Sequence, residues 1–436
     1  MTARIHHADL YGPRGGKYDW LNDHDVASTD WQNVQPTQPF YLFKPQDRSL
    51  WAEYENGWKL PEAMPLNGTG VITKRDFLSI HMTAEEVWRT VAKFAELSEA
   101  DAREHFKLPK DVRDWHHDWA KADVLQSGPS KDCIKPILYR PFDVRKVYYT
   151  GRTRGFIGWP VVKVMRHMLG RDNVAISTSR QVEIARSWEH AFCCDEMIQH
   201  HTVSSKEVNY LFPLYVYPDP DKVFEDTPWA EGAGGRRPNL APAFVEQFAG
   251  KLGLKFVSDG RGDLKKTFGP EDIFHYAYAV FHSPTYRKRY AEFLKIDFPR
   301  LPLTSDAKLF AALCGLGAEL VGLHLLQRVP DPQAGYPAAG DNTVTRTGKK
   351  AYKPPTAEAP GRVYINDAQY FEPVPPEVWG FHVGGYQVCE KWLKDRKGRT
   401  LSYDDIETYR RITEAVRQTL RLMGAIDAAI PAWPLV

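Results

Sequence analysis

Basic and aromatic side chains occur together in three stretches of the sequence, a mixture that suits a polyanion with stackable bases. Residues 139–166 hold seven arginines and lysines and a single acid, Asp143. Residues 285–300 hold five basic residues against two acids, and residues 391–399 hold five against one. The formal net charge of the chain is only +2. The distribution of charge, rather than its total, therefore indicates a nucleic-acid partner, with a solvated surface as the alternative interpretation of each stretch.

Several patterns that would mark a catalytic site are missing from the sequence. An adenine methyltransferase holds the flipped base with an Asn/Asp-Pro-Pro-aromatic tetrad, and no such tetrad occurs. A Gly-x-x-x-x-Gly-Lys-Ser/Thr loop for nucleotide phosphates and a Gly-x-Ser-x-Gly nucleophile elbow are also missing. We therefore expect no cofactor in this chain and no catalysis by the chain in isolation.

Histidine pairs are the candidates for a metal site, because imidazole is a common zinc ligand. The pairs are His6-His7, His116-His117 and His200-His201, the last of them near Cys193 and Cys194. Adjacent side chains rarely share one metal, and the five cysteines form no Cys-x-x-Cys pair. We predict no metal site and no disulfide framework, and interpret the cysteines as small buried hydrophobic residues.

The elements that must position the basic residues read as a mixed α+β fold. The first ~215 residues contain β-branched and aromatic clusters of strand length, bounded by turn residues, which favour a mixed sheet. Thr83 and Glu86 have capping-box spacing and Ser98 opens another short helix, so a helical insertion is expected over residues 83–107. Residues 159–170, with Pro160 in the first turn, are expected to form one helix.

The second half changes to helical periodicity. We predict helices over residues 273–281, 283–295 and 305–326, and a closing helix that Ser402 and Asp405 cap. The predicted organisation is a mixed α/β lobe over residues 1–217, a Pro/Gly-rich connection over 218–270, a helical lobe over 271–328, a basic loop over 329–362 and a C-terminal α/β segment over 363–436.

Membrane association is not expected. No apolar run approaches the roughly 20 residues of a membrane helix, and the first residues lack the layout of a signal peptide. We expect a soluble, cytoplasmic protein.

Three stretches together resemble the carboxy-terminal target-recognition region of type ISP restriction-modification enzymes and related single-chain adenine methyltransferases. They are Gly68-Thr-Gly-Val-Ile-Thr-Lys-Arg-Asp-Phe77, Tyr139-Arg-Pro-Phe-Asp-Val-Arg-Lys-Val-Tyr-Tyr149 and residues 273–300, which begin Ile273-Phe-His-Tyr-Ala-Tyr. The resemblance implies a region that reads double-stranded DNA, with a methyltransferase domain or subunit as its partner. S-adenosylmethionine is then expected only in that partner, and nuclease and motor parts lie elsewhere. The resemblance fits both a fragment of a longer polypeptide and a separate subunit that docks on a catalytic partner.

Candidate DNA contacts follow from what a base-reading surface needs. Arginine guanidinium groups and the side-chain amides of asparagine and glutamine read base edges, whereas lysine, serine and threonine contact phosphates and fix the position of the protein along the DNA. The predicted base readers are Arg75, Arg180 and Gln181. The predicted phosphate or backbone contacts are Thr73, Lys74, Arg140, Arg145, Lys206, Arg287, Lys391 and Lys394.

Each candidate has a structural alternative. Arg140 and Asp143 could pair within their own turn, and the tyrosines of residues 283–295 could pack while their basic neighbours meet water or a methyltransferase. For the whole chain, the alternatives to DNA recognition are a scaffold that docks on a methyltransferase and a metal-dependent enzyme with an unrecognised site.

Overall fold

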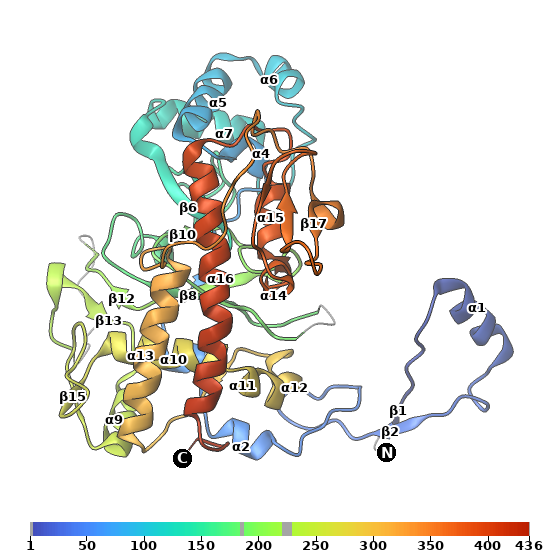
Figure 1. The fold of residues 1–436 in the computed structure, drawn as a ribbon, viewed down its shortest axis with the longest axis vertical. Helices are drawn as coiled ribbons and strands as arrows, with labels where there is room; N and C mark the ends of the chain where they lie inside the picture. The colour runs from blue at the N-terminus through green and yellow to red at the C-terminus, as the bar shows by residue number, and fades with distance from the viewer. Residues whose placement is uncertain (1–2, 184–186, 220–228, 436) are drawn as a thin grey trace. The chain divides into compact units, whose positions relative to one another are not determined.

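A computed structural model describes residues 3–183, 187–219 and 229–435 of the chain (Figure 1). The chain divides into two compact units, Met1–Ala52 and Glu53–Val436. The predicted boundaries near residues 217, 270, 328 and 362 all fall inside the second unit and stay predictions.

The first unit is small and has no core of its own. Strands β1 (Ile5–His7) and β2 (Gln32–Val34) pair antiparallel, and helix α1 (Arg14–Asp23) lies between them in sequence. None of the described residues before Glu53 is buried.

Two four-stranded sheets form the amino-terminal part of the second unit, as expected for a mixed α+β fold. The first has the order β10-β6-β7-β5, with β10 parallel to β6. The second has the order β4-β11-β8-β9 and is antiparallel throughout. The strands are β5 (Ile80–His81), β6 (Ile134–Arg140), β7 (Asp143–Tyr148), β10 (Met197–Ile198), β4 (Gly68–Thr69), β8 (Ala175–Ser179), β9 (Ala191–Cys194) and β11 (Asn209–Pro213).

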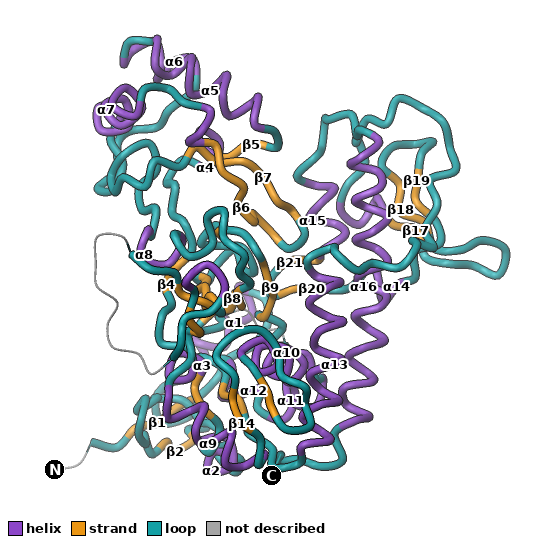
Figure 2. The backbone as a smooth tube through the Cα atoms, turned by 90° about the vertical axis from the view of Figure 1, so that its left-hand side faces the viewer, coloured by secondary structure: helices purple, strands orange, loops and turns teal. Residues whose placement is uncertain are grey.

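The predicted helical insertion is present as helices α5 (Ala84–Glu96) and α6 (Glu99–His105), followed by α7 (His117–Ser127). Thr83 and Glu86 form the predicted capping box, and Ser98 caps α6. Helix α5 buries Val87, Val91 and Phe94 at helical spacing. Figure 2 shows the three helices together beyond strands β5 to β7.

Three long helices build the core of the helical part: α10 (Pro270–His282), α13 (Ala307–His324) and α16 (Tyr403–Ala429). Helix α13 packs against both others, and both views show α13 and α16 side by side (Figures 1 and 2). A Cβ on Gly317 would lie 1.9 Å from the carbonyl oxygen of His275, so the α10–α13 contact requires glycine there. Among the described residues, α13 alone has the length and apolar composition of a membrane span, and its packed position explains that composition.

Two local predictions need correction. Residues 159–170 hold only the short helix α8 (Val162–Met165), because Val161 takes a left-handed conformation with φ +52° that a continuous helix does not allow. Residues 283–295 form two helices, α11 (Pro284–Arg289) and α12 (Ala291–Leu294), separated at Tyr290. The predicted connection over 218–270 contains helix α9 (Pro242–Leu252), and its residues 220–228 lie outside the described chain.

The C-terminal segment is a small α/β layer. It contains a three-stranded sheet, β17 (Tyr352–Lys353), β18 (Arg362–Tyr364) and β19 (Tyr370–Phe371), and the hairpin of β20 (His382–Val383) and β21 (Tyr386–Gln387). Helices α14 (Pro376–Trp379) and α15 (Val388–Lys394) lie beside α16, which begins at the predicted Ser402–Asp405 capping box.

The remaining elements are α2 (Trp51–Glu55), β3 (Trp58–Lys59), α3 (Leu60–Ala63), α4 (Asp76–Ser79), β12 (Tyr215–Val216), β13 (Arg237–Pro238), β14 (Lys255–Phe256), β15 (Thr267–Phe268) and β16 (Arg300–Leu301).

Candidate nucleic-acid interface

The register of the second sheet brings three groups of predicted contact residues to one end of it. Asn209 at the start of β11 pairs with Ser179 at the end of β8, and Tyr210 pairs with Thr69 at the end of β4. Residues 73–75 follow β4, residues 180–181 follow β8, and Lys206 precedes β11. The strand ends at residues 69, 179 and 209 therefore lie side by side, and residues 73–75 lie four or more residues beyond the first of them, next to Asp114 and Gly158. We call this region the sheet end.

Lys74 and Arg75 at the sheet end have opposite surroundings. Lys74 is exposed, has φ +66°, and its ammonium lies 3.5 Å from a carboxylate oxygen of Asp114. Arg75 is only 7% exposed and donates to the carbonyl oxygens of Lys74 and Lys110 at 2.9 and 2.8 Å. The buried Thr73 hydroxyl donates to Asp76. Lys74 is thus exposed but partly neutralised, and its phosphate contact stays a prediction, whereas Arg75 is occupied inside the protein.

Arg180 and Gln181 are exposed at the end of β8. The Arg180 side chain is 54% exposed, and its Nε donates to Asp297 at 3.1 Å, a carboxylate that Lys59 also contacts at 2.9 Å. The guanidinium therefore keeps free donors toward solvent. Both side chains are exposed, and their contacts with base edges remain a prediction.

Lys206 is exposed in the turn before β11. Its backbone N–H donates to Ser204 Oγ at 3.3 Å, and the Ser204 hydroxyl in turn donates to Glu207. Within the described chain, no carboxylate lies within ion-pair distance of its ammonium. Lys206 therefore remains a candidate phosphate contact at the sheet end.

Arg145 and Arg140 lie away from solvent in the β6–β7 hairpin. The Arg145 side chain is 11% exposed, and its Nη2 lies 2.7 Å from both Asp143 Oδ2 and Asp395 Oδ2. Arg140 is 9% exposed and donates to Gln199 Oε1 at 2.9 Å, rather than to Asp143 as the alternative interpretation proposed. Neither guanidinium offers a free face to a phosphate in this conformation.

Asp143 is the centre of a charged cluster that joins the hairpin to the C-terminal segment. It is 1% exposed and accepts from Arg145 and, at 3.0 Å, from Arg396 Nη2. Burial opposes its ionisation, but Arg396 and Arg145 outweigh that cost and hold the pKa of the carboxyl below its ordinary value. The sequence analysis named Arg145 but missed the role of Arg396, which lies 253 residues from Asp143.

Lys391 and Lys394 lie on α15 at the edge of this cluster. Lys391 pairs with Asp395, whereas Lys394 is exposed and has no ion-pair partner among the described residues. Lys394 therefore remains available for a polyanion, and Lys391 is partly neutralised.

Arg287 and the start of α11 do not form a free anion site. Arg287 is 7% exposed and donates to the carbonyl oxygen of Phe281 at 2.7 Å, and burial lowers its pKa to about 10. The Thr285 backbone N–H already donates to Asp427 Oδ2 at 3.0 Å, and Ser283 donates to the same carboxylate. The helix start thus has an internal acceptor where the sequence suggested a phosphate.

The histidines and cysteines show no assembled zinc cluster within the described chain. Cys193 and Cys194 are fully buried in β9, where burial raises the pKa of Cys193 to about 12. The His200 ring bonds to the Gln199 amide at 2.9 Å, and burial lowers the pKa of His200 to about 4. The described groups with metal-like spacing are Asp111, His116 and Asp118, and Asp111 already pairs with Arg103 at 2.9 Å.

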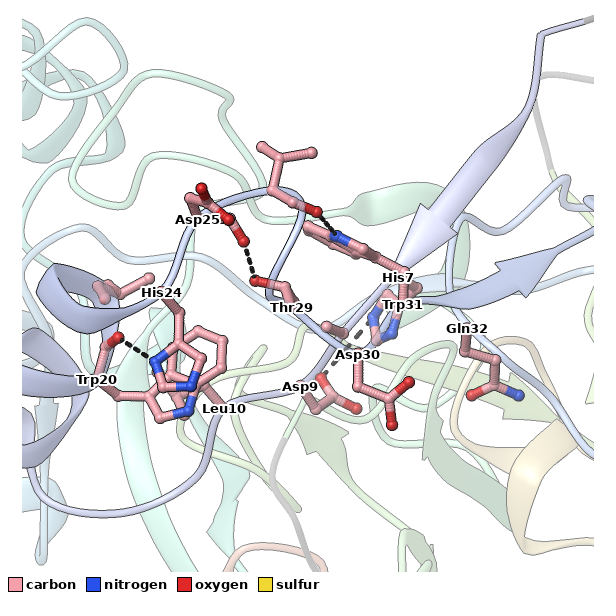
Figure 3. A pocket seen from close by; sticks show the side chains of 13 residues that line it. His7, Asp9, Leu10, Trp20, His24, Asp25, Thr29, Asp30, Trp31 and Gln32 are labelled. Carbon is pink, nitrogen blue, oxygen red and sulfur yellow. Dashed lines mark hydrogen bonds and ion pairs between the residues drawn. The ribbon is translucent and has the colours of Figure 1, made fainter.

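A hollow of about 740 Å³ lies in the first unit (Figure 3). Trp20 stacks on His24 with ring centroids 4.1 Å apart, and the Trp31 indole donates to the carbonyl oxygen of Val26 at 2.8 Å. His7 lies 3.7 Å from Asp9. The hollow is lined by residues of β1, α1, β2 and the loops between them, and none of these residues is buried.

Comparison with known proteins now identifies the class. Residues 62–425 match the family described as the Type ISP C-terminal specificity domain. The chain belongs to this family. Among curated protein sequences, no significant match is found.

Solved structures with the same fold share little sequence. The chain is similar to the structure titled as a DrdV–DNA complex, with a TM-score of 0.69, 19% identity, and 94% of this chain and 42% of that chain covered. It is also similar to a nuclease-deletion mutant of the Type ISP restriction-modification enzyme LlaGI in complex with a DNA substrate mimic, with a TM-score of 0.64, 18% identity, and 97% and 33% covered.

A third similar structure is the ATP-dependent Type ISP restriction-modification enzyme LlaBIII bound to DNA. Its TM-score is 0.64 and its identity 16%, with 93% of this chain and 26% of that chain covered. The chain therefore spans less than half the length of each of these three proteins.

Proposed function

We propose that this chain recognises a double-stranded DNA target for a restriction-modification enzyme that methylates adenine. Membership of the Type ISP specificity-domain family over residues 62–425 is the observation that carries the proposal. Two of the similar structures are complexes with DNA, and the LlaGI mutant is in complex with a DNA substrate mimic. The chain supplies specificity, and a methyltransferase domain or subunit, with its own S-adenosylmethionine, supplies the chemistry, in the cytoplasm.

The sheet end supports this function physically. Phosphate contacts need exposed cations that fix the position of the protein along the DNA, and base reading needs guanidinium groups or side-chain amides beside these cations. Lys74 and Lys206 are exposed cations, and Arg180 and Gln181 are exposed directly after β8. A rigid sheet thus presents both kinds of side chain from three separate loops.

Salt dependence of duplex binding tests the proposal. Each phosphate contact releases counterions, so log K falls with log salt at about 0.9 per contact on B-form DNA. The 436-residue chain is titrated into a fluorescent duplex of random sequence at several salt concentrations, and anisotropy is measured. A steep negative slope is expected. Failure to bind any duplex at low salt, with binding to a methyltransferase that salt does not weaken, would favour the scaffold instead.

A further inference from the structure

Two loops of the second unit, residues 70–76 and 150–163, are joined into one element that we call the bridged loops. Ile72 and Trp159 exchange two backbone hydrogen bonds of 2.9 Å each, and the Gly158 N–H donates to the Thr73 carbonyl oxygen at 3.3 Å. A Cβ on Gly158 would lie 3.0 Å from Lys74 Cγ and 3.2 Å from the Ile72 carbonyl oxygen. A side chain at Gly158 would therefore crowd the neighbouring loop.

The backbone of the bridged loops is held in an unfavourable conformation at three side-chain-bearing positions. Lys74, Arg154 and Val161 have φ values of +66°, +55° and +52°. Such left-handed residues other than glycine persist only where surrounding structure enforces them, and they cluster at binding and catalytic sites. Two of the three are cations. The conformation fixes where their side chains leave the backbone.

The second loop is anchored firmly at its base. Phe156 and Ile157 are completely buried, and the Trp115 indole donates to the Phe156 carbonyl oxygen at 3.1 Å. The Asp123 carboxylate accepts from the Phe156 N–H at 2.8 Å and from the Thr150 hydroxyl at 2.9 Å. A rigid base lowers the entropy that the exposed residues lose on binding a partner.

The exposed part of the second loop combines positive charge with apolar surface. Arg152, Arg154 and Lys163 are exposed, and residues 150–163 contain no acid. Trp159 is 37% exposed and Val162 is 41% exposed. The acids that contact the two loops already have partners. Asp114 is buried and shared by Lys74 and Arg113, Asp123 is buried and accepts from the second loop, and Asp76 accepts from the Thr73 hydroxyl. The surface is thus complementary in charge to a polyanion.

We propose that the bridged loops enter a groove of the target DNA, with Arg154 as a specificity-determining residue and Trp159 as an apolar wedge against a base step. This inference rests on the proposed function and extends it to residues that lie beside the sheet end, because residues 73–75 belong to both. A planar guanidinium on a fixed backbone suits bidentate contact with guanine. Apolar side chains that minor-groove proteins insert between base steps partly unstack the bases and bend the duplex, and Trp159 is assigned the same effect on a base step beside the one that Arg154 contacts.

The test compares variants of the 436-residue chain on two duplexes, one selected by the chain from a randomised library and one of random sequence. Arg154→Ala is expected to weaken the selected duplex by about 10- to 100-fold and the random duplex much less. Arg154→Lys keeps the charge but not the fork, so it should retain random binding and lose the preference at one base pair. Arg421→Ala, which removes an exposed cation of α16, is the matched control and should change neither.

Trp159 is tested by the shape of the bound DNA. Trp159→Ala should reduce the bend of the selected duplex, measured by energy transfer between dyes at its two ends. Tyr403→Ala, which removes an exposed ring on α16, should leave the bend unchanged. Thermal unfolding that matches the unaltered chain shows that each variant is folded.

The outcomes separate this inference from the proposed function. If the unaltered chain selects no sequence, the proposed function fails. If it selects one, and the Arg154 and Trp159 variants keep the same preference, affinity and bend, only the role of the bridged loops is overturned. Equal weakening of both duplexes by Arg154→Ala, with an unchanged preference, would also overturn it, because that result describes a phosphate contact.

Discussion

Replacement of Asp143 by asparagine is expected to destabilise the fold severely, because it removes the central carboxylate of the buried charged cluster. Asp143 lies between Arg145 Nη2 at 2.7 Å and Arg396 Nη2 at 3.0 Å, and none of the three side chains is more than 11% exposed. Removing one partner of a buried pair costs about 3–5 kcal/mol, because the other charge stays buried without compensation.

The expected magnitude lies at the lower end of that range, about 3 kcal/mol. Each arginine keeps a second carboxylate: Arg145 has Asp395 at 2.7 Å, and Arg396 has Asp405 at 3.5 Å. The effect should also depend on pH. The folded-state pKa of Asp143 is lowered, so its contribution is complete above the unfolded pKa of about 3.9 and is lost as pH falls through the folded value.

Urea denaturation followed by tryptophan fluorescence measures the change. Trp392 reports on the cluster directly, because the Arg396 guanidinium lies 3.4 Å from its ring centroid. Asp367→Asn is the matched control: Asp367 pairs with Arg346 at 3.0 Å but is 92% exposed, so its loss should cost less than about 1 kcal/mol. If Asp143→Asn and Asp367→Asn lower the free energy of unfolding equally, the reasoning about burial is wrong.

Three further predictions follow from the same geometry. Arg180→Ala and Gln181→Ala should each weaken binding to the preferred duplex by about 1–3 kcal/mol and relax the preference at one base pair, as measured by competition binding over a randomised duplex library. Unchanged preferences in both variants would show that base reading does not occur at the end of β8. Arg75→Ala should lower the free energy of unfolding by about 2 kcal/mol because its bonds to two carbonyl oxygens are lost; a stable variant with altered base preference would restore Arg75 as a reader. Acid should destabilise the fold between pH 6.5 and 4, because burial lowers the pKa values of His167, His200 and His275 to about 4. In this window the unfolded chain binds more protons than the folded chain, which costs up to about 1.4 kcal/mol per pH unit per histidine. A free energy of unfolding that stays flat between pH 6.5 and 4 would contradict this prediction.

Local sequence patterns predicted the elements that depend on local bonds. The capping boxes at Thr83–Glu86 and Ser402–Asp405 are present because each needs only four consecutive residues. The helix predicted over 159–170 is wrong because Trp159 pairs with Ile72 and Val161 turns the chain, a constraint set 87 residues earlier in sequence. Periodicity and Pro–Gly placement contain no information about such a partner.

For the candidate site too, the sequence predicted features that depend on residue type and missed features that depend on tertiary packing. Residue types suited to DNA contact were recognisable, and Lys74, Lys206 and Arg180 are exposed, but their contacts stay predictions. Burial of Arg145 was not predictable, because its partners Asp143 and Asp395 come together only through tertiary packing. The convergence of three loops at the sheet end likewise depends on strand register. Arg154 was counted in a basic stretch, but its left-handed backbone has no local signature.

Selection of duplexes from a randomised library by the 436-residue chain tests the central claim most directly. A specificity domain should enrich one short sequence and bind it at least about a thousandfold more tightly than random DNA at physiological salt. Tight binding with no enriched sequence at any salt concentration would contradict the claim, because it would leave the basic surface as a general phosphate-binding face.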